Sequence, residues 1–562
     1  MTGRHNRSNG TSTTDRTTDD SGLDVLLIGI DAGCLPVFER LYEEGRIPNL
    51  ERLCTGPGNV SAPLESQIPP WTPSAWPSIF TGVNPGKHGV VGFVGYDGYD
   101  WHVSSNDDVQ ERSLWSLLDH HDRSSVVVNV PVTHPPDEFD GAIIPGFIGP
   151  ENPKCHPEGT LEDVREAIGE YRVYPCYTRG DESVSDREKM AEYQRLIRMR
   201  GEAFRYLVGK HEPDFGFVQF QKTDTVFHEF AGDPDKVETV YEATDDQIGK
   251  ILEECDPDTV FVVSDHGMGP YEGYEFRINE FLEEAGYLET TTSGKGMPSW
   301  QPMRHQLREG KDCDSWEPTM AERAAAVAAR FGITARRARI ALERVGLADH
   351  VIKYAPQNVA RTANRQVDFA ASQAYVRART ELGVRINLEG REPNGVVSPS
   401  EYDALRESLM ADLRSVETPD GEPVFETVAP REEYFHGPYE EHAVDIVTIP
   451  ADFEHALSEE LLGEQFGPVE PWNHKLDGVF AASGAGIDEN AALGYPSIYD
   501  VAPTVLAALG IPQSDRMDGT VLPIVDSLGT EAYPTAAEST PANRDGADET
   551  VTARLADLGY MN

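Results

Sequence analysis

Three stretches of the sequence place carboxylate and imidazole side chains at or just beyond the end of an apolar run. They are VLLIGIDAG at 25–33, QFQKTDTVFHEF at 219–230 and VFVVSDHGMG at 260–269. Carboxylate oxygens and imidazole nitrogens are the ligands that divalent ions take in proteins. Two such ions about 4 Å apart clamp the attacking and leaving oxygens of an in-line displacement. The residue types therefore predict a two-metal phosphoryl-transfer site, with candidate ligands Asp31, Asp224, His228, Asp265 and His266.

Each of these groups also has a structural interpretation when it is taken alone. An acid after a strand, such as Asp31, commonly caps a helix or a turn. Asp224 and His228 would share one face of a helix at this spacing, as many solvated pairs do. Asp265 and His266 directly follow a buried strand, where polar side chains need partners. The metal interpretation depends on the three stretches taken together.

The segment from Pro69 to Gly89 is the candidate source of a nucleophile, because it contains hydroxyl groups and no acid. Its prolines fix several φ angles and predict a stiff turn rather than a long helix. A hydroxyl needs a neighbouring base or a metal to become a strong nucleophile, and no histidine adjoins Thr72 in the turn. The alternative is a structural loop followed by a short helix at 76–82. The hydroxyl groups belong to Thr72, Ser74, Ser78 and Thr81.

The elements that must position these groups alternate between strands and helices. Helical stretches, such as the one at 237–255, lie between the apolar runs. Strands that alternate with helices predict an α/β fold with a central, mainly parallel sheet flanked by helices, and such sheets bind ligands at the carboxyl ends of their strands. The predicted strands are 24–30, 125–130, 215–220, 259–264, 443–449 and 478–484.

The chain is long enough for one α/β core with large insertions. Residues 1–22 and 526–562 are poor in apolar residues and are predicted to be a disordered leader and a flexible tail. The Ala- and Arg-rich region 286–370 has strong helix propensity and is predicted to be a helical insertion or cap. The catalytic core then has two parts, 23–285 and 371–525.

The charge of the chain is strongly acidic. Its 96 acidic residues outnumber its 48 basic residues, of which only 11 are lysines, and the formal net charge is −48. This balance excludes binding to duplex nucleic acid or anionic membranes, which needs basic patches. Acidic, lysine-poor surfaces suit high salt, where screening over about 3 Å at 1 M removes self-repulsion. We therefore expect a halophilic source.

The location of the protein is predicted from what the sequence contains. The first twenty residues are polar, and no run of about 18 apolar residues occurs, so we expect no membrane association and a cytoplasmic protein. The six scattered cysteines form no CxxC pair and are expected to be reduced. The sequence gives no indication of the oligomeric state.

The order and spacing of the motifs resemble the alkaline phosphatase superfamily, and most closely its type I phosphodiesterase/nucleotide pyrophosphatase branch, in a haloarchaeal form. The resemblance covers about 24–285 and 370–525. It implies an alkaline-phosphatase-like sandwich around the predicted sheet. The matching motifs are Asp31, Thr72 with Thr81-Gly82 nine and ten residues on, NPGKHG at 84–89, Asp224-TVF-His228 and Asp265-His266-Gly267.

The resemblance also implies roles for individual residues. A final histidine ligand is expected among His436, His442, His455 and His474, and the H-x-x-DG passage favours His474. One ion would then be held by Asp224, His228 and His474, and the other by Asp31, Asp265 and His266 with Thr72 completing its ligands. Thr72 would be the nucleophile and form a phosphothreonine intermediate on a small phosphorylated substrate. Mixed nitrogen and oxygen ligands suit zinc, with manganese as the alternative.

Departures from the family pattern leave the substrate open. Ala75 stands three residues after Thr72, in the region where nucleotide pyrophosphatases have an asparagine that contacts a phosphoryl oxygen. That contact is left to the backbone N–H of Thr72 or Ser74, or to a side chain such as Lys222 or Asn129. The only basic residue between Ile47 and Lys87 is Arg52, which favours a diester over a monoester.

Other activities of the same superfamily remain alternatives. A phosphomonoesterase is one. A sulfatase is another, although Thr72 cannot become formylglycine and Trp76 stands where a sulfatase has arginine. A mutase-like transferase would need more lysine and arginine. An alternative of another class is a non-catalytic metal-binding scaffold, against which the complete set of ligand residues argues.

Overall fold

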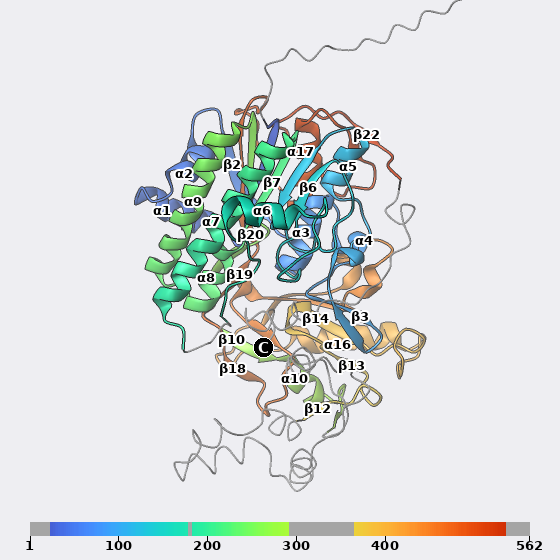
Figure 1. The fold of residues 1–562 in the computed structure, drawn as a ribbon. Helices are drawn as coiled ribbons and strands as arrows, with labels where there is room; N and C mark the ends of the chain where they lie inside the picture. The colour runs from blue at the N-terminus through green and yellow to red at the C-terminus, as the bar shows by residue number, and fades with distance from the viewer. Residues whose placement is uncertain (1–22, 178–182, 292–364, 535–562) are drawn as a thin grey trace, which may run out of the picture.

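A computed structural model describes residues 23–177, 183–291 and 365–534 of the chain. Its centre is a seven-stranded sheet in which β1 pairs in parallel with β7 and β8, and β5 pairs in parallel with β7 and β6 (Figure 1). β20 is antiparallel to both β8 and β2 at one edge. The strand order is β2 (Val60–Glu65), β20 (Asp477–Gly484), β8 (Thr259–Val263), β1 (Val25–Ile30), β7 (Phe215–Phe220), β5 (Ser125–Val128) and β6 (Gly141–Ile144). The predicted α/β fold with a mainly parallel central sheet is confirmed.

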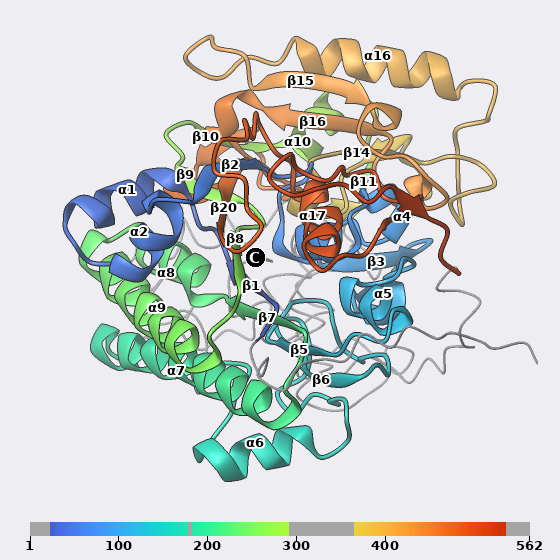
Figure 2. The same cartoon turned by 90° about the horizontal axis from the view of Figure 1, so that it is seen from above.

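Helices cover both faces of this sheet, so its central strands are apolar on both sides. In β1, Leu26 and Ile28 face one helical layer, while Val25 and Leu27 face the other. Figure 2 shows the two layers on opposite sides of the sheet. The first layer includes α1 (Leu35–Glu43), α2 (Pro48–Thr55), α6 (Thr160–Ile168), α7 (Asp186–His211) and α9 (Pro234–Cys255). The second includes α3 (Thr72–Thr81), α5 (Leu114–His120) and α17 (Val501–Ala508).

The register of the three central strands brings the predicted metal ligands to one edge. Ile30 lies opposite Phe220, and Gly29 lies opposite Val263. Since the strands are parallel, the segments that begin at Asp31, Gln221 and Ser264 leave the sheet side by side. The carboxyl ends of these three strands therefore meet at one edge of the sheet.

The prediction of a stiff turn rather than a long helix after Pro69 is wrong in part. A ten-residue helix, α3, begins at Thr72 and is buried throughout. Pro73 is tolerated because the first turn of a helix has no acceptor for its missing N–H. Pro77 does cost one helical hydrogen bond. The packing of a wholly buried helix between the sheet and α17 offsets that loss.

Several smaller sheets form a separate part of the structure, which lies below β19 (Trp472–Lys475) in the view of Figure 1. The predicted strand at 443–449 belongs here, as β16, and not to the main sheet. The four-stranded sheet has the order β13 (Ala374–Tyr375), β14 (Gly383–Ile386), β16 (Ile446–Pro450) and β15 (Phe425–Pro430), beside α16 (Tyr402–Arg414). The three-stranded sheet has the order β17 (Ala456–Ser458), β10 (Tyr274–Arg277) and β18 (Phe466–Pro468), beside α10 (Ile278–Glu284).

Short ladders join the remaining segments. β3 (Val94–Asp97) pairs with β4 (Asp100–Val103), and β21 (Gln513–Ser514) pairs with β22 (Thr530–Glu531). β11 (Thr290–Thr291) pairs with β12 (Gln366–Val367), so the two described ends of the predicted insertion at 286–370 lie together. The rest of that insertion, the predicted leader and the tail beyond 534 fall outside the described residues. Within the described residues, no helix is long and apolar enough to cross a membrane.

Candidate metal centre

Asp31 enters the candidate site directly from the end of β1 and is fully buried. Gln219 donates from Nε2 to Asp31 Oδ2 over 2.7 Å, and the indole N–H of Trp76 approaches the same oxygen at 3.4 Å. The backbone carbonyl of Asp31 accepts from the Thr223 hydroxyl at 2.6 Å. These contacts fix the carboxylate at the sheet edge with Oδ1 directed toward Thr72. Sequence reasoning missed Gln219, although a glutamine inside the apolar run FGFVQF was a signal.

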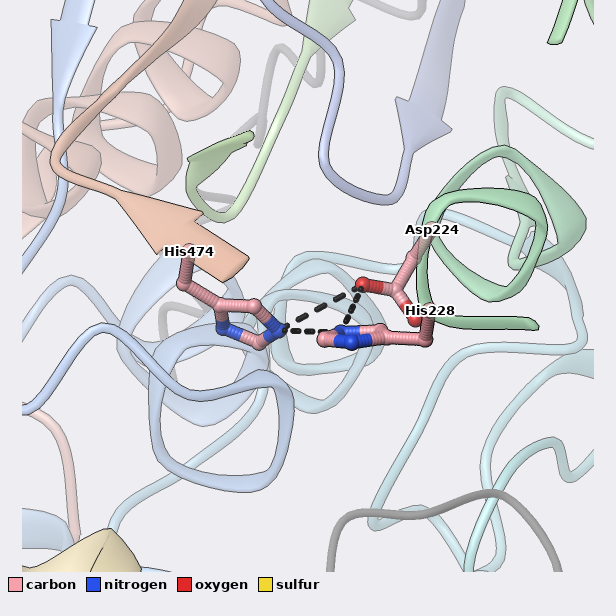
Figure 3. A group of neighbouring side chains, drawn as sticks. All are labelled: Asp224, His228 and His474. Atoms are coloured by element: carbon pink, nitrogen blue, oxygen red, sulfur yellow. Dashed lines mark hydrogen bonds and ion pairs between the residues drawn. The ribbon is translucent and has the colours of Figure 1, made fainter. Parts of the chain in front are cut away.

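Asp224 and His228 lie one turn apart on α8 (Lys222–Phe230), and His474 reaches them from β19 (Figure 3). β19 pairs antiparallel with β9 (Gly267–Pro270), which follows β8, so this pairing places His474 over the sheet edge. His228 Nε2 and His474 Nε2 lie 3.3 Å and 3.4 Å from Asp224 Oδ1. The two nitrogens are 3.0 Å apart. The structure thus brings His474 to Asp224 and His228, although His474 lies 246 residues after His228 in the sequence.

These separations fit a metal ion. Ligands at about 2.0–2.1 Å from a tetrahedral ion lie about 3.3 Å from one another, as these three atoms do. Both carboxylate oxygens of Asp224 are buried and have no hydrogen-bond partner. His474 Nδ1 donates to the Pro70 carbonyl at 2.8 Å, which leaves the lone pair of the neutral ring on Nε2. Buried acceptors without donors are rare in proteins, and a cation satisfies them.

A second group surrounds the hydroxyl of Thr72, the first residue of α3. Thr72 Oγ1 lies 3.4 Å from Asp31 Oδ1 and 3.4 Å from His266 Nε2. Asp265 Oδ2 lies 3.2 Å from the same imidazole nitrogen. His266 Nδ1 donates to the Gly267 carbonyl at 2.9 Å, so its Nε2 also presents a lone pair when neutral. Four predicted site residues converge here.

Asp224 lies between the two groups. Ligand atoms of Asp31, Asp224 and His266 lie within 4.8 Å of one another, as do those of Asp224, His228 and His474. The expected ligand Asp265 is outside the tighter group, and its Oδ1 accepts from the Ala32 N–H at 3.3 Å. Its Oδ2 is buried without a hydrogen-bond partner. The imidazoles of His266 and His474 stack with ring centroids 3.7 Å apart, so the two groups form one continuous centre.

Burial and mutual repulsion set the protonation of this centre. Burial raises the pKa of Asp31 well above its ordinary value, and the charges of Asp265 and Asp224 raise it further. The pKa of Asp265 rises for the same reasons. Burial opposes ionisation of Asp224 too, but the imidazoles of His228 and His474 hold its pKa below the ordinary range. Without cations, these carboxylates repel one another and favour taking up protons.

The other candidate histidines lie elsewhere. His455 Nδ1 accepts from the Tyr274 N–H at 3.0 Å, and His442 Nδ1 lies 3.3 Å from the Gly89 carbonyl. The backbone of His436 contacts Asn84. Of the four histidines considered from the sequence, the structure places His474 beside Asp224 and His228.

Two of the candidate oxyanion contacts are already engaged. The Ser74 N–H donates to the Trp71 carbonyl at 3.0 Å. The amide of Asn129 donates to the backbone and side-chain oxygens of Gln219 at 3.0 Å and 2.8 Å. Lys222 lies buried at the start of α8, two residues before Asp224.

The comparisons with known proteins identify a family and a similar fold. A sequence model of the type I phosphodiesterase/nucleotide pyrophosphatase family matches residues 25–338. The chain is similar in structure to a phosphonoacetate hydrolase from Sinorhizobium meliloti 1021 in complex with phosphonoformate. The two are 15% identical over 85% of this chain and 94% of that chain, with a TM-score of 0.50. This similarity concerns the fold.

Two further solved structures are similar at lower scores. The wild-type alkaline phosphatase PafA is 15% identical over 87% of this chain and 96% of its own, with a TM-score of 0.48. Murine ectonucleotide pyrophosphatase/phosphodiesterase 5 is 12% identical over 90% of this chain and 97% of its own, with a TM-score of 0.42. No curated protein sequence matches the chain significantly.

Proposed function

Because the chain belongs to the type I phosphodiesterase/nucleotide pyrophosphatase family, whose members are phosphoric ester hydrolases, we propose that it hydrolyses small phosphodiesters or pyrophosphates through Thr72. The observation that carries the proposal is the convergence of six carboxylate and imidazole side chains at the sheet edge, two of which, Asp31 and His266, lie 3.4 Å from the buried Thr72 hydroxyl. The residue assignments below are part of this proposal.

The residues fit two divalent ions. Asp224, His228 and His474 would hold one, and Asp31, His266, Asp265 and Thr72 would hold the other, with Asp224 placed to contribute to both. When bound, such ions supply Lewis-acid stabilisation of charge on the phosphoryl oxygens and lower the pKa of a bound hydroxyl. We propose zinc for this mixed nitrogen and oxygen set, with manganese as the alternative.

The side chains around Thr72 direct its reactivity. The hydroxyl lies within 3.4 Å of Asp31 Oδ1, which is positioned to accept its proton. Thr72 Oγ1 then attacks phosphorus in line, forming a new P–O bond while the bond to the leaving alcohol or phosphate breaks. Water hydrolyses the resulting phosphothreonine and regenerates the hydroxyl, so that one difficult step becomes two easier ones. The start of a rigid, buried helix holds Oγ1 in place for this attack.

The charge around the nucleophile favours a diester. Within the described residues, no lysine or arginine side chain forms a hydrogen bond with Thr72. A monoester carries an additional negative charge on the reacting group, which would need such a cation. We therefore propose a phosphodiesterase or nucleotide pyrophosphatase rather than a phosphomonoesterase. The high-salt adaptation, the cytoplasmic location and the lack of duplex nucleic-acid binding remain predictions from the sequence.

The nucleophile is tested by comparing three aryl esters with three variants of the metal-loaded protein. Bis(4-nitrophenyl) phosphate should be hydrolysed faster than 4-nitrophenyl phosphate and 4-nitrophenyl sulfate. Thr72→Ala should lower kcat on the diester by about 10³-fold or more, whereas Thr72→Ser retains a hydroxyl and should retain measurable turnover. Ser74→Ala, which removes the next hydroxyl of α3, is the matched control.

Two results would contradict the proposal. Full diesterase activity in Thr72→Ala would exclude Thr72 as the nucleophile. If the proposal is right, a quenched reaction of the wild-type protein should show phosphate on the peptide that contains Thr72. Purified protein that binds no divalent ion and hydrolyses none of the esters would support the non-catalytic scaffold.

A further inference from the structure

A pocket lies beside the candidate metal centre, between α7 and the carboxyl ends of β5 and β7. Phe220 ends β7, and Gln221 and Lys222 follow it into α8. Asn129 follows β5, and Arg200 enters from the middle of α7. These four polar side chains share the pocket wall with Phe220 and with apolar residues of α7.

Two buried cations face this pocket. The residues Lys222 and Arg200 are 4% and 3% exposed. Within the part of the chain that the structure describes, neither forms an ion pair with a carboxylate. Lys222 Nζ donates to Gln221 Oε1 at 2.6 Å and approaches the Thr225 hydroxyl at 3.4 Å. Arg200 donates to the backbone carbonyls of Arg172 and Val173, and its guanidinium lies 4.8 Å from the centroid of the Tyr171 ring. Buried cations of this kind are rare because they lose hydration without gaining a counter-charge.

Donors without acceptors line the same pocket. Gln221 Nε2 and Arg200 Nε are both buried and have no hydrogen-bond partner. Lys222 has three N–H donors, and only two acceptors lie near it. Unsatisfied buried donors cost about 1–3 kcal/mol each, so a folded protein keeps them where a ligand satisfies them. A ligand that satisfies these donors supplies acceptor oxygens, and one that also pairs with the two basic side chains carries negative charge.

The pocket is distinct from the place of the scissile phosphoryl group. Its lining includes neither Thr72 nor any proposed metal ligand. It adjoins that centre, because Lys222 begins the helix that carries Asp224, and Asn129 contacts Gln219, which in turn holds Asp31. A substrate bound at Thr72 can therefore extend a second group toward Lys222.

We propose that this pocket binds a second anionic group of the substrate, a carboxylate or a terminal phosphate, through Lys222, Arg200 and Gln221. The proposal rests on the proposed phosphodiesterase function and narrows its substrate class to diesters or pyrophosphates with an additional negative charge. Arginine and lysine form charge-assisted hydrogen bonds with such oxygens, and these are stronger than neutral ones.

The kinetic test compares diesters that differ in one group. The probes are 4-nitrophenyl benzyl phosphate and its two analogues with a carboxylate or a phosphate on the benzyl ring. In Lys222→Met, kcat/KM should fall at least about tenfold more on the two charged diesters than on the uncharged one, mainly through KM. A loss confined to one charged analogue identifies carboxylate or phosphate as the group. Equal losses on all three diesters, or no loss on any, would overturn the proposal.

A direct binding measurement separates failure of this inference from failure of the proposed function. Benzoate and phenyl phosphate are titrated into the full-length, metal-loaded protein by calorimetry. Lys222→Met and Arg200→Met should each weaken binding of at least one of them about tenfold. Lys210→Met, which removes a lysine paired with Asp163 at the end of α7, is the surface-charge control.

The two measurements have different outcomes if only one proposal fails. A protein that hydrolyses no diester but loses benzoate or phenyl phosphate binding on Lys222→Met disproves the catalytic proposal and retains the anion pocket. Binding that is unchanged in Lys222→Met disproves the pocket whatever the activity. The Arg200 guanidinium holds two backbone carbonyls of the loop before α7, so Arg200→Met could fail to fold. In that case the binding measured for Lys222→Met still tests the anion pocket.

Discussion

Two fully buried carboxylates in this protein have opposite surroundings. Asp445, beside the four-stranded sheet, accepts hydrogen bonds from the Ile386 N–H and the Tyr402 hydroxyl at 2.7 Å each, and from Arg391 and Arg431. Asp224, at the edge of the main sheet, has no hydrogen-bond partner on either oxygen. A carboxylate enclosed by arginines and donors is complete within the fold. One that faces imidazoles and other acids has the surroundings that suit a bound cation.

The pKa of Asp445 and the pKa values of Asp31 and Asp265, the two acids near Asp224, shift in opposite directions. The pKa of Asp224 itself is lowered despite its burial, by the imidazoles of His228 and His474. Burial tends to raise the pKa of Asp445, but hydrogen bonds and charge from Arg391 prevail and lower it to about 2. At the metal centre, burial raises the pKa of Asp31 and Asp265, and neighbouring acids add to the increase. The buried charge of Asp445, beside the smaller sheets, thus stabilises the fold. We propose that the buried acids at the edge of the main sheet instead bind metal ions.

Removal of divalent ions should have the largest effect. Exhaustive chelation should reduce diesterase activity by about 10³-fold or more, since the ions supply the charge stabilisation that the acids themselves cannot. Elemental analysis of the purified protein should find two ions per chain, and addition of zinc or manganese to chelated protein should restore turnover. Full activity in protein that has lost all its metal would contradict the proposal that the acids at the sheet edge, unlike Asp445, bind cations.

Two substitutions compare how Asp445 and Asp265 contribute to the free energy of unfolding. Asp445→Asn leaves buried arginines without their counter-charge and should lower the free energy of unfolding by about 3–5 kcal/mol. Asp265→Asn keeps the acceptor for the Ala32 N–H and removes a repelling charge. In chelated protein it should therefore leave stability unchanged or raise it. Urea unfolding of both variants without metal provides the measurement, and equal destabilisation would refute the distinction.

Acid should affect Asp445 in a defined pH range. Its pKa is about 2 in the folded protein against an ordinary value of 3.8. A group whose pKa is lower in the folded state stabilises it above the unfolded pKa, and this contribution is lost as pH falls through the folded pKa. Asp445 should therefore contribute about 2–3 kcal/mol above pH 4 that disappears toward pH 2. The difference in unfolding free energy between the wild type and Asp445→Asn, measured from pH 5 to pH 2, should shrink accordingly.

The sequence predicted most of the fold around the site because its signals there are local. The strands at 25–30 and 259–264 are largely apolar runs that an aspartate follows at once, and Asp224 follows the strand at 215–220 within one helical turn. The helix at Thr72 was missed because four prolines argue against a helix, while its stability comes from tertiary burial. The four-stranded sheet was missed in the same way, since an apolar run such as 443–449 does not identify its partner strands.

The sequence indicated the candidate site residues themselves more completely than the residues that surround them. Order and spacing indicated Asp224 and His228. The contact of Gln219 with Asp31, and that of Glu470 with His228, depend on how separate segments of the chain meet. Asp265 shows the same limit, because adjacency to His266 in sequence does not determine which oxygen faces the centre. The buried cations Lys222 and Arg200 are 22 residues apart and carry no motif.

The smallest expected effect concerns Glu470, which marks the boundary between the two kinds of acid. Its carboxylate lies 3.6 Å from His228 Nδ1 and is 25% exposed, so it orients the imidazole from outside the centre. Loss of such an orienting partner typically weakens metal affinity 10- to 100-fold. Because this contact is long and partly solvated, we expect Glu470→Gln to weaken affinity about tenfold while leaving unfolding of the chelated protein unchanged. Competition with a chromophoric chelator measures the affinity, and Glu464→Gln, on the other side of β18, is the control. A loss of stability without any loss of affinity would place Glu470 with Asp445 among the structural acids.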